Sequence, residues 1–259
     1  QMCIRDSNDA FGTLHRAHAS VVGLPALIPV RAAGFLVDKE ISYLNRLVHA
    51  PEKPFAAILG GAKVSDKIPV ISNLIHKADS LLIGGAMAYT FFAAQGLEVG
   101  RSLVESGMSE TALELIKKAG KLKCPIHLPL DHITALSMDD PKSVRLIEEF
   151  PFPENVMALD IGPKTIETFL RIASQVKTIF WNGPMGVFEK EAFSKGTMAL
   201  ARGIAASSAF SVIGGGDSVS AVNKAGVESS ISHVSTGGGA SLQYIADETL
   251  PGINALMEN

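Results

Sequence analysis

Residues 210–218 read FSVIGGGDS, which is an apolar, β-rich run followed by three glycines and a polar residue. The same order of a short β-rich run, glycine and a helix-like stretch recurs at residues 55–63, 81–85, 156–163, 178–184 and 233–239. Apolar residues at helical spacing fill gaps at 36–48, 109–121 and 164–176, and residues 125–130 read as a further strand. Strands that alternate with helices predict right-handed crossovers and a parallel sheet. The predicted fold class is therefore α/β, a three-layer Rossmann-like parallel sheet flanked by helices.

All six glycine turns follow strands, so they are expected at the carboxyl ends, where such sheets bind ligands. Glycine lets a ligand approach the backbone closely, and the helix that follows offers free N–H groups and partial positive charge. A single turn of this kind is explained by a tight connection alone. Six together, three of them with two or three consecutive glycines and a polar neighbour, favour a site for a polyphosphate.

Composition excludes several classes of protein. The chain has 259 residues, 47% hydrophobic and 19% charged, so a packed core is expected rather than disorder. The net charge of −3 gives no overall basic field for binding nucleic acid. Two cysteines without a CxxC motif favour a reducing compartment over a disulfide framework. The uncharged run at residues 80–97 is interrupted by Gly84 and Gly85, and it reads as a strand, a turn and a helix rather than a membrane span.

Common phosphate and catalytic motifs are absent from the sequence. There is no GxxxxGK[ST], and the 214–216 glycines lack the third glycine of GxGxxG, so a P-loop protein is excluded and a dehydrogenase is poorly supported. No HExxH or GxSxG occurs. His15 and His18 have a spacing that could suit a metal, but no further ligand cluster accompanies them.

Four polar residues near the glycine turns could carry chemistry, and their spacing leaves alternatives open. Lys63 and Lys67 lie on one helix face, either as a solvated face paired with an acid or as phosphate ligands. Asp217 either caps a helix or holds Mg²⁺, which prefers one or two carboxylates plus substrate phosphates. Glu189 could be an ordinary surface acid. Spacing alone does not choose a reaction.

Long stretches of the chain resemble the phosphoglycerate kinase family, in that family's order and spacing. They are DAFGTLHRAH (9–18), LGGAKVSDK (59–67), FWNGPMGVFE (180–189), GGGDS (214–218), VSTGGGAS (234–241) and the closing LPGI (250–253). The resemblance implies reversible phosphoryl transfer between 1,3-bisphosphoglycerate and MgADP, which gives 3-phosphoglycerate and MgATP in glycolysis. It also implies a cytoplasmic monomer whose two α/β domains close over small-molecule substrates, with no nucleic-acid or membrane partner.

The resemblance also implies residue roles. Arg16 matches an arginine that binds the phosphate of the glycerate substrate, and His15 beside it is the weaker candidate. Lys63 matches the lysine on the transferring phosphoryl group, and Lys67 the lysine on the nucleotide phosphates. Asp217 would hold the metal. The implied catalytic set is Lys63, Gly215 and Gly238, with Gly237 and Gly239 at the same helix start. The implied nucleotide-binding set is Lys63, Lys67, Gly85, Gly162, Gly183, Glu189, Gly215, Gly216, Asp217 and Ser218, with Glu189 on the ribose.

The match covers the later part of the family and implies a division of the chain. Residues 1–7 (QMCIRDS) share no pattern with the rest and are expected to be a non-native scar. Residues 8–35 resemble a remnant of a second α/β domain that binds substrate, 36–50 the interdomain helix and 51–240 the nucleotide-binding domain. Residues 241–259 resemble a segment that returns to the first domain, and here they are expected to lack a packing partner.

These expectations define two functional hypotheses. The first is a fragment of phosphoglycerate kinase that binds ATP or ADP with Mg²⁺ but turns over little alone; the alternative is a non-catalytic nucleotide-binding module. Two departures from the family pattern bear on them. Ala86 stands where a third glycine is common and could crowd the nucleotide, whereas Ser218 keeps the hydroxyl of the usual threonine.

Overall fold

A computed structural model describes residues 5–257, and its largest element is a six-stranded parallel sheet. The strand order is β11-β10-β9-β3-β4-β5. The strands are β3 (Phe55–Leu59), β4 (Ser80–Ile83), β5 (Ile126–His127), β9 (Thr178–Asn182), β10 (Phe210–Gly214) and β11 (His233–Val234). In chain order, the sheet begins at β3 and grows through β4 to β5 on one side. It then continues on the other side of β3 with β9, β10 and β11.

Helices cover both faces of this sheet, which confirms the predicted three-layer α/β class. Alternate residues of β3 belong to different cores: Phe55, Ala57 and Leu59 to one, and Ala56 and Ile58 to the other. One face is covered by α2 (Phe35–His49), α3 (Ile68–Lys77), α4 (Met87–Ala94), α5 (Ser109–Lys121) and α9 (Gly238–Asp247). The other is covered by α6 (Pro163–Gln175), α7 (Lys195–Ala206) and α8 (Gly216–Ala225). Burial on both sides explains the continuous apolar runs of the strands.

The uncharged run at 80–97 forms β4, a glycine turn and α4, as its sequence predicted. Tyr89 and Thr90 of α4 are buried. None of the helices within residues 5–257 is both long and apolar enough to cross a membrane.

One predicted strand belongs to a different sheet. Residues 156–160 were expected in the parallel sheet, but β8 (Met157–Ile161) lies in a three-stranded antiparallel sheet of order β7-β6-β8. Its partners are β6 (His132–Ala135) and β7 (Arg145–Ile147), which sequence analysis did not predict. Because β8 pairs with this hairpin, the glycine turn that follows β8, at Gly162, is not at the carboxyl edge of the parallel sheet. The strand predicted at 125–130 is shorter than expected, since β5 contains only two residues.

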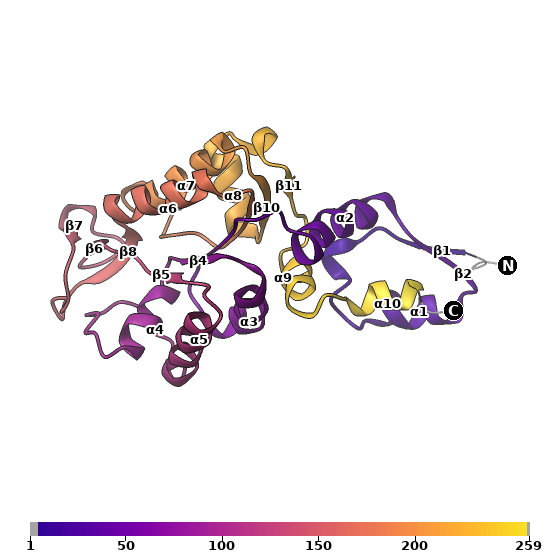
Figure 1. The fold of residues 1–259 in the computed structure, drawn as a ribbon, viewed down its shortest axis with the longest axis horizontal. Helices are drawn as coiled ribbons and strands as arrows, with labels where there is room; N and C mark the ends of the chain where they lie inside the picture. The colour runs from indigo at the N-terminus through magenta and orange to yellow at the C-terminus, as the bar shows by residue number, and fades with distance from the viewer. Residues whose placement is uncertain (1–4, 258–259) are drawn as a thin grey trace.

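The first and last parts of the described chain form a small lobe beside α2 (Figure 1). It contains β1 (Arg5–Asn8) paired in parallel with β2 (Val30–Ala33), α1 (Leu24–Leu27) and α10 (Pro251–Met257). Contrary to expectation, the closing segment has a packing partner: the N–H of Gly252 donates to the carbonyl of Leu14 at 2.9 Å. A methyl group at Gly252 would lie 2.6 Å from the Leu14 side chain. Several apolar side chains of this lobe remain exposed, Phe35 at 94% and Leu27 at 82%.

A buried carboxylate joins α2 to the edge of the sheet and the start of α9. Glu40 is fully buried and accepts hydrogen bonds from His233 Nε2 at 2.7 Å and from Thr236, through the backbone N–H at 2.6 Å and Oγ1 at 2.7 Å. Tyr43 stacks on the His233 ring with centroids 4.4 Å apart. Burial by itself raises the pKa of Glu40, but the bonds from His233 and Thr236 outweigh it and hold the pKa below its usual value.

We expect Glu40→Ala to lower the free energy of unfolding by about 3 kcal/mol, because Thr236 and His233 lose their acceptor inside the protein. A lowered pKa stabilises the fold above the ordinary glutamate range, and this contribution is lost as the pH falls through the lowered pKa. The deficit of the variant, measured by urea unfolding, should therefore shrink on acidification. The control Asp38→Ala removes an exposed acid from the same helix and should cost under about 1 kcal/mol. Equal costs for the two variants would contradict this role of Glu40.

Candidate functional site

Three glycine turns meet backbone to backbone at the carboxyl edge of the parallel sheet. The N–H groups of Gly60 and Gly61 donate to the carbonyls of Asn182 and Pro184, each at 2.9 Å. The N–H of Gly85 donates to the carbonyl of Met185 at 3.1 Å. The turns after β3, β4 and β9 are therefore fixed to one another by main-chain bonds rather than by side chains.

The close approach of these turns requires glycine. Gly85 has φ +65°, and a methyl group there would lie 2.5 Å from the Gly61 nitrogen and 2.8 Å from the Pro184 oxygen. Gly183 has φ +97°, and its methyl group would lie 2.3 Å from the Gly60 oxygen. Both positions combine a left-handed backbone with no room for a side chain. Gly85 and Gly183, predicted to contact nucleotide, thus also have a structural reason to be glycine.

A polar pocket of about 290 Å³ opens beside these turns. It is lined by Gly61, Ala62, Lys63, Asp66, Lys67, Asn182, Gly183, Pro184, Gly215, Gly216, Asp217 and Ser218. The structure thus brings together both predicted lysines and the whole turn at 215–218. Two cationic side chains beside the first turn of α8 provide the donors and positive charge that suit a polyphosphate.

Lys67 is the better enclosed of the two lysines. It precedes α3 directly and is partly buried, whereas Lys63 is exposed. Burial lowers the pKa of Lys67, while the carboxylates of Asp66 and Asp217 oppose that shift. A lysine that is already partly stripped of water loses less hydration when an anionic ligand arrives, which favours the pairing.

A second helix start meets the first at this pocket. A methyl group on Gly238, the first residue of α9, would lie 3.1 Å from the Cα of Gly215, which precedes α8. A methyl group on Gly239 would lie 3.1 Å from His15 Nε2, and one on Gly237 would overlap the Phe11 ring. The N–H-rich ends of α8 and α9 therefore converge, with the segment of residues 11–15 against α9.

Of the two predicted substrate residues, His15 lies against the start of α9. Burial, followed by the charge of Arg16, lowers the pKa of His15, so its imidazole favours the neutral form. Arg16 itself is exposed and lines neither this pocket nor its neighbour. The structure thus places His15 next to α9 but leaves the Arg16 guanidinium outside both pockets.

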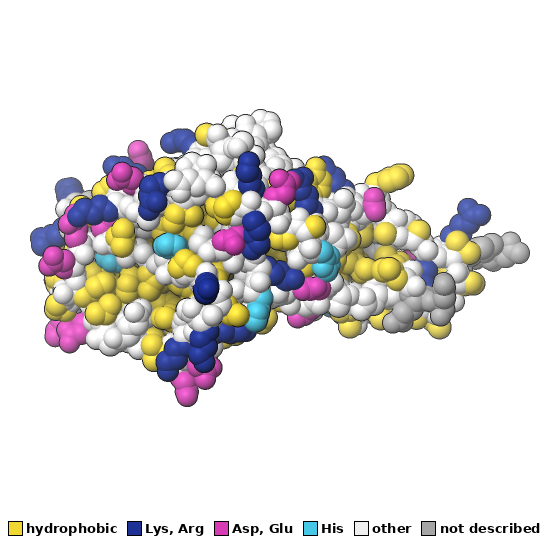
Figure 2. Space-filling model, viewed as in Figure 1, with side chains coloured by type: hydrophobic (Ala, Val, Ile, Leu, Met, Phe, Trp, Pro, Cys, Tyr) yellow, Lys and Arg dark blue, Asp and Glu magenta, His cyan; other side chains and the backbone are white. Residues whose placement is uncertain are grey.

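An apolar pocket of about 440 Å³ adjoins the polar one, and both are lined by Gly61, Ala62, Pro184 and Asp217. Its other lining residues are Gly85, Ala86, Tyr89, Arg101, Leu103, Met138, Met157, Ala158, Leu159, Asp160, Met185, Gly186, Val187 and Glu189. Figure 2 shows apolar side chains gathered on one face of the molecule, between the antiparallel sheet and α4. An apolar slot with polar groups at its rim suits a planar base and a sugar. Glu189 is exposed at this rim, and Ala86 contributes its methyl group to the wall.

Sequence reasoning assigned no role to Asn182, although it is the last residue of β9. Its side chain is 3% exposed, and Nδ2 has no hydrogen-bond partner among the described residues. This amide lies close to Gly215, whose methyl group would be 2.9 Å from Nδ2. In contrast to Asn182, Ser218 already has a partner within the protein, because its hydroxyl accepts a hydrogen bond from the Gly183 N–H at 2.6 Å. A buried donor without a partner at the pocket marks Asn182 as a ligand candidate. Its position at a strand end was the available signal.

Gly162 lies outside both pockets, so the structure does not bring it together with the other nucleotide candidates. A methyl group there would lie 2.3 Å from Asp131 Cγ. The Asp131 carboxylate accepts hydrogen bonds from the N–H groups of Lys164 and Thr165 at 2.9 and 2.8 Å. It therefore caps α6 from a position 33 residues before Lys164 in the sequence. The nucleotide contact at Gly162 stays a prediction of the resemblance.

The donor set of the polar pocket fits Mg²⁺ bound together with phosphates. No group of three or more His, Cys, Asp or Glu side chains is arranged to hold a metal within residues 5–257. Asp217 and Asp66 nevertheless line the same pocket as the two lysines. Mg²⁺ commonly takes one or two carboxylates and completes its shell with substrate phosphates and water. Both acids are exposed, and Asp217 lies in the first turn of α8.

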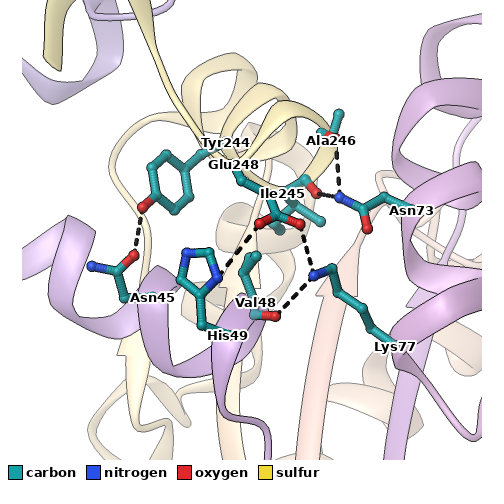
Figure 3. A network of polar contacts seen from close by, with 9 residues as sticks. All are labelled: Asn45, Val48, His49, Asn73, Lys77, Tyr244, Ile245, Ala246 and Glu248. Carbon is teal, nitrogen blue, oxygen red and sulfur yellow. Dashed lines mark hydrogen bonds and ion pairs between the residues drawn. The ribbon is translucent and has the colours of Figure 1, made fainter. Parts of the chain in front are cut away.

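Helix α3, which follows Lys67, and helix α9, which begins at Gly238, are joined at their far ends. Figure 3 shows Glu248, after α9, between His49 of α2 and Lys77 at the end of α3. Its carboxylate pairs with Lys77 Nζ at 2.7 Å and with His49 Nδ1 at 3.5 Å. Asn73 donates to the carbonyls of Ile245 and Ala246 at 2.7 and 3.0 Å. The helices α3 and α9 are thus tied together toward their C-terminal ends.

The fold and the site define an α/β protein with paired polar and apolar pockets at the carboxyl edge of a parallel sheet. The family model described as phosphoglycerate kinase matches residues 7–248. The chain belongs to the phosphoglycerate kinase family, as the sequence motifs indicated.

Relatives and solved structures agree with this membership. The chain is 50% identical to the phosphoglycerate kinase of Anaeromyxobacter sp. (strain Fw109-5), over 96% of this chain and 63% of the relative. It is 52% identical to that of Chlorobium phaeobacteroides (strain BS1), over 96% of this chain and 64% of the relative. The structure of phosphoglycerate kinase from Coxiella burnetii superposes with a TM-score of 0.93 at 40% identity, over 98% of this chain and 65% of that one. This chain therefore spans somewhat less than two thirds of the length of these relatives.

The glycine contacts lead to a stability prediction. Gly85→Ala should lower the free energy of unfolding by about 3 kcal/mol or more, since it adds a backbone clash to a left-handed φ. Gly96, with φ +82° at the other end of α4, has nothing within 4 Å of an added methyl group. Gly96→Ala should therefore cost only the backbone strain, about 1–2 kcal/mol. Urea unfolding of both variants measures the difference, and a smaller loss for Gly85→Ala than for Gly96→Ala would refute the interlocked turns.

Proposed function

We propose that this chain provides the nucleotide-binding half of a phosphoglycerate kinase, which transfers a phosphoryl group reversibly between 1,3-bisphosphoglycerate and MgADP. The convergence of Lys67 with the starts of α8 and α9, next to an apolar pocket, carries the proposal. In this arrangement the nucleoside occupies the apolar pocket and its phosphates occupy the polar one. Glu189 at the rim would bind the ribose, as the family resemblance implies.

The residues of the polar pocket would act by positioning and charge neutralisation. Phosphoryl transfer passes through a loose transition state that needs little covalent help from the protein. Lys67 would neutralise the nucleotide phosphates, and Lys63 would contact the transferring phosphoryl group. The free N–H groups at Gly238 and Gly239 point along the axis of α9, where they can donate to charge that develops on the transferring oxygens. Gly215 and Gly216 would play the same part at the start of α8.

Asp217 would hold Mg²⁺ against the nucleotide phosphates. When bound, the cation neutralises phosphate charge and helps to align the transferring group. Asp66 is the second carboxylate in the same pocket and could hold a water molecule of its shell. The two lysines, Lys63 and Lys67, balance the charges of Asp66 and Asp217 and keep the pocket close to neutral before the substrates enter.

The glycerate side of the reaction is represented by few residues of this chain. His15 lies at the start of α9 and Arg16 follows it, and the resemblance assigns Arg16 to the substrate phosphate. We infer that further substrate ligands would come from the part of the relatives that this chain does not span. The complete enzyme would be a cytoplasmic monomer of glycolysis whose domain closure excludes water from the reacting groups.

Binding of MgADP tests the nucleotide half. We expect one saturable site by calorimetry, and Lys67→Ala should weaken it tenfold or more, because a charge-assisted bond to phosphate is worth about 1.5–3 kcal/mol. Asp217→Ala should weaken binding only when Mg²⁺ is present. Lys121→Ala, an exposed lysine of α5 outside both pockets, is the matched control and should leave the affinity unchanged. Adenosine, which lacks phosphates, should bind Lys67→Ala and the parent chain equally.

Turnover distinguishes the fragment from a complete enzyme. In a coupled assay with 3-phosphoglycerate and MgATP, the chain alone should show little or no activity, since most glycerate ligands are absent. Turnover at the level of full-length relatives would overturn that expectation. The alternative function, a non-catalytic nucleotide-binding module, predicts that MgADP binding persists but that adding 3-phosphoglycerate leaves the MgADP affinity unchanged.

A further inference from the structure

The Asp160 carboxyl is enclosed between three parts of the chain beside the apolar pocket. It lies near the end of β8 and is only 3% exposed. Its Oδ2 accepts from the N–H of Gly196 in the first turn of α7 at 2.8 Å, and its Oδ1 accepts from the N–H of Ile161 at 2.9 Å. Methyl groups on Gly186 or Gly196 would each lie 2.4 Å from Oδ1. Side chains are thus excluded on both sides to make room for this carboxyl.

Asp160 connects two walls of the apolar pocket. Residues 157–160, from β8, and residues 184–187, in the turn after β9, all line this pocket. The Val187 N–H donates to the Leu159 carbonyl at 2.8 Å, and Gly186 packs on the Asp160 carboxyl directly beside that bond. The same carboxyl holds the first turn of α7 through Gly196. The separation of the two walls therefore depends on a good fit around this one group.

This carboxyl has no cationic partner. It forms no ion pair with a lysine, arginine or histidine in the part of the chain that the structure describes. Burial raises the pKa of Asp160 to about 7, and the N–H donors of Gly196 and Ile161 only partly oppose that rise. The carboxyl is therefore divided between its two protonation states near neutral pH.

The titratable groups on neighbouring elements do not compensate the charge. Tyr89 of α4 stays neutral, because burial and then the charges of Asp160 and Asp131 raise its pKa. Burial lowers the pKa of His132, on the paired strand β6, to about 4, so it is also neutral. Lys195 at the start of α7 and Arg101, which lines the same pocket, are exposed, and neither forms an ion pair with Asp160. Asp131, whose carboxylate caps α6, can only add negative charge.

We propose that Asp160 is a positioning residue of the nucleoside pocket, and that nucleotide binds preferentially to the form in which this carboxyl is protonated. The inference rests on the proposed function, because it takes a nucleoside as the occupant of the apolar pocket. A bound base excludes water from the pocket and makes the charged carboxyl less favourable. The nucleotide phosphates next to it are anionic and act in the same direction. Binding therefore takes up a fraction of a proton near pH 7, and the affinity falls as the pH rises from 6 to 8.

Asp131 offers a matched control. It is a second fully buried aspartate that accepts backbone N–H groups at a helix start, but it lines neither pocket. Asp131→Asn and Asp160→Asn make the same chemical change, and both replace one acceptor oxygen by an amide that opposes an N–H donor. Both should destabilise the fold, so loss of stability does not distinguish them. Only Asp160→Asn should alter how the protein binds nucleotide.

The experiment is titration calorimetry of the whole chain with MgADP at pH 6, 7 and 8, in buffers of different ionisation enthalpy. Proton uptake on binding is obtained from the buffer dependence of the observed heat. We expect Asp160→Asn to bind about fivefold more weakly at pH 6, where the parent carboxyl is protonated and both its oxygens still accept. The difference in MgADP affinity between Asp160→Asn and the parent chain should narrow towards pH 8. Titration of ADP itself contributes equally to the proton uptake of all three proteins. Beyond this contribution, the parent chain and Asp131→Asn should take up a fraction of a proton on binding, and Asp160→Asn should not.

The outcomes separate this inference from the proposed function. If the folded parent chain does not bind MgADP, both are refuted. If it binds, but proton uptake and the pH profile are the same in Asp160→Asn, then the nucleotide site stands and the role of Asp160 is refuted. If Asp160→Asn does not fold, Asp160→Glu and the proton uptake of the parent chain decide. No proton uptake beyond that of free MgADP would then overturn the proposal.

Discussion

The backbone contact between the turns at Gly60, Gly85 and Gly183 is the constraint on which the site depends. Each turn ends a different strand of the parallel sheet, and main-chain hydrogen bonds of 2.9–3.1 Å join them where any Cβ would overlap a neighbouring backbone atom. This close packing brings three strand ends within reach of one ligand. It also leaves the next helical turns free to present N–H groups outward. The polar pocket is thus a consequence of omitting side chains as much as of placing Lys67 and Asp217.

A second constraint links this edge of the sheet to the small lobe. Glu40 of α2 bonds to His233 and Thr236, and Thr236 lies directly before the glycines at which α9 begins. A shift of α2 relative to the sheet would therefore act on the start of α9, where Gly238 packs against Gly215 of the polar pocket. Because the carboxylate is fully buried and has three donors, this connection resists extension more than an exposed ion pair does.

The parallel sheet could be predicted because its strands are buried on both faces, which gives continuous apolar runs that end in glycine, as at residues 210–216. The hairpin of β6 and β7 was missed for the opposite reason: its strands are three or four residues long, and Arg145 and Leu146 are exposed. Motif likeness identified both lysines and Asp217, which share one pocket. It gave no indication of Asp160, whose bond to Gly196 spans 36 residues, because rules for helix starts consider only adjacent sequence.

The helices α3 and α9 show why a site of this kind needs more than its ligands. Lys67 precedes α3 and Gly238 opens α9, so the offset of two packed helices affects how far the Lys67 side chain lies from the N–H donors of α9. Packing along their lengths limits that offset, and Asn73, Lys77 and Glu248 fix it again at the far ends (Figure 3). Glu248 itself has a left-handed backbone, with φ +62°, and it ends α9. Its carboxylate lies toward α3, where it pairs with Lys77. The partly exposed pair with Lys77 contributes little stability. Its physical effect is to favour one register of the two helices, of which α3 follows Lys67 and α9 begins at Gly238.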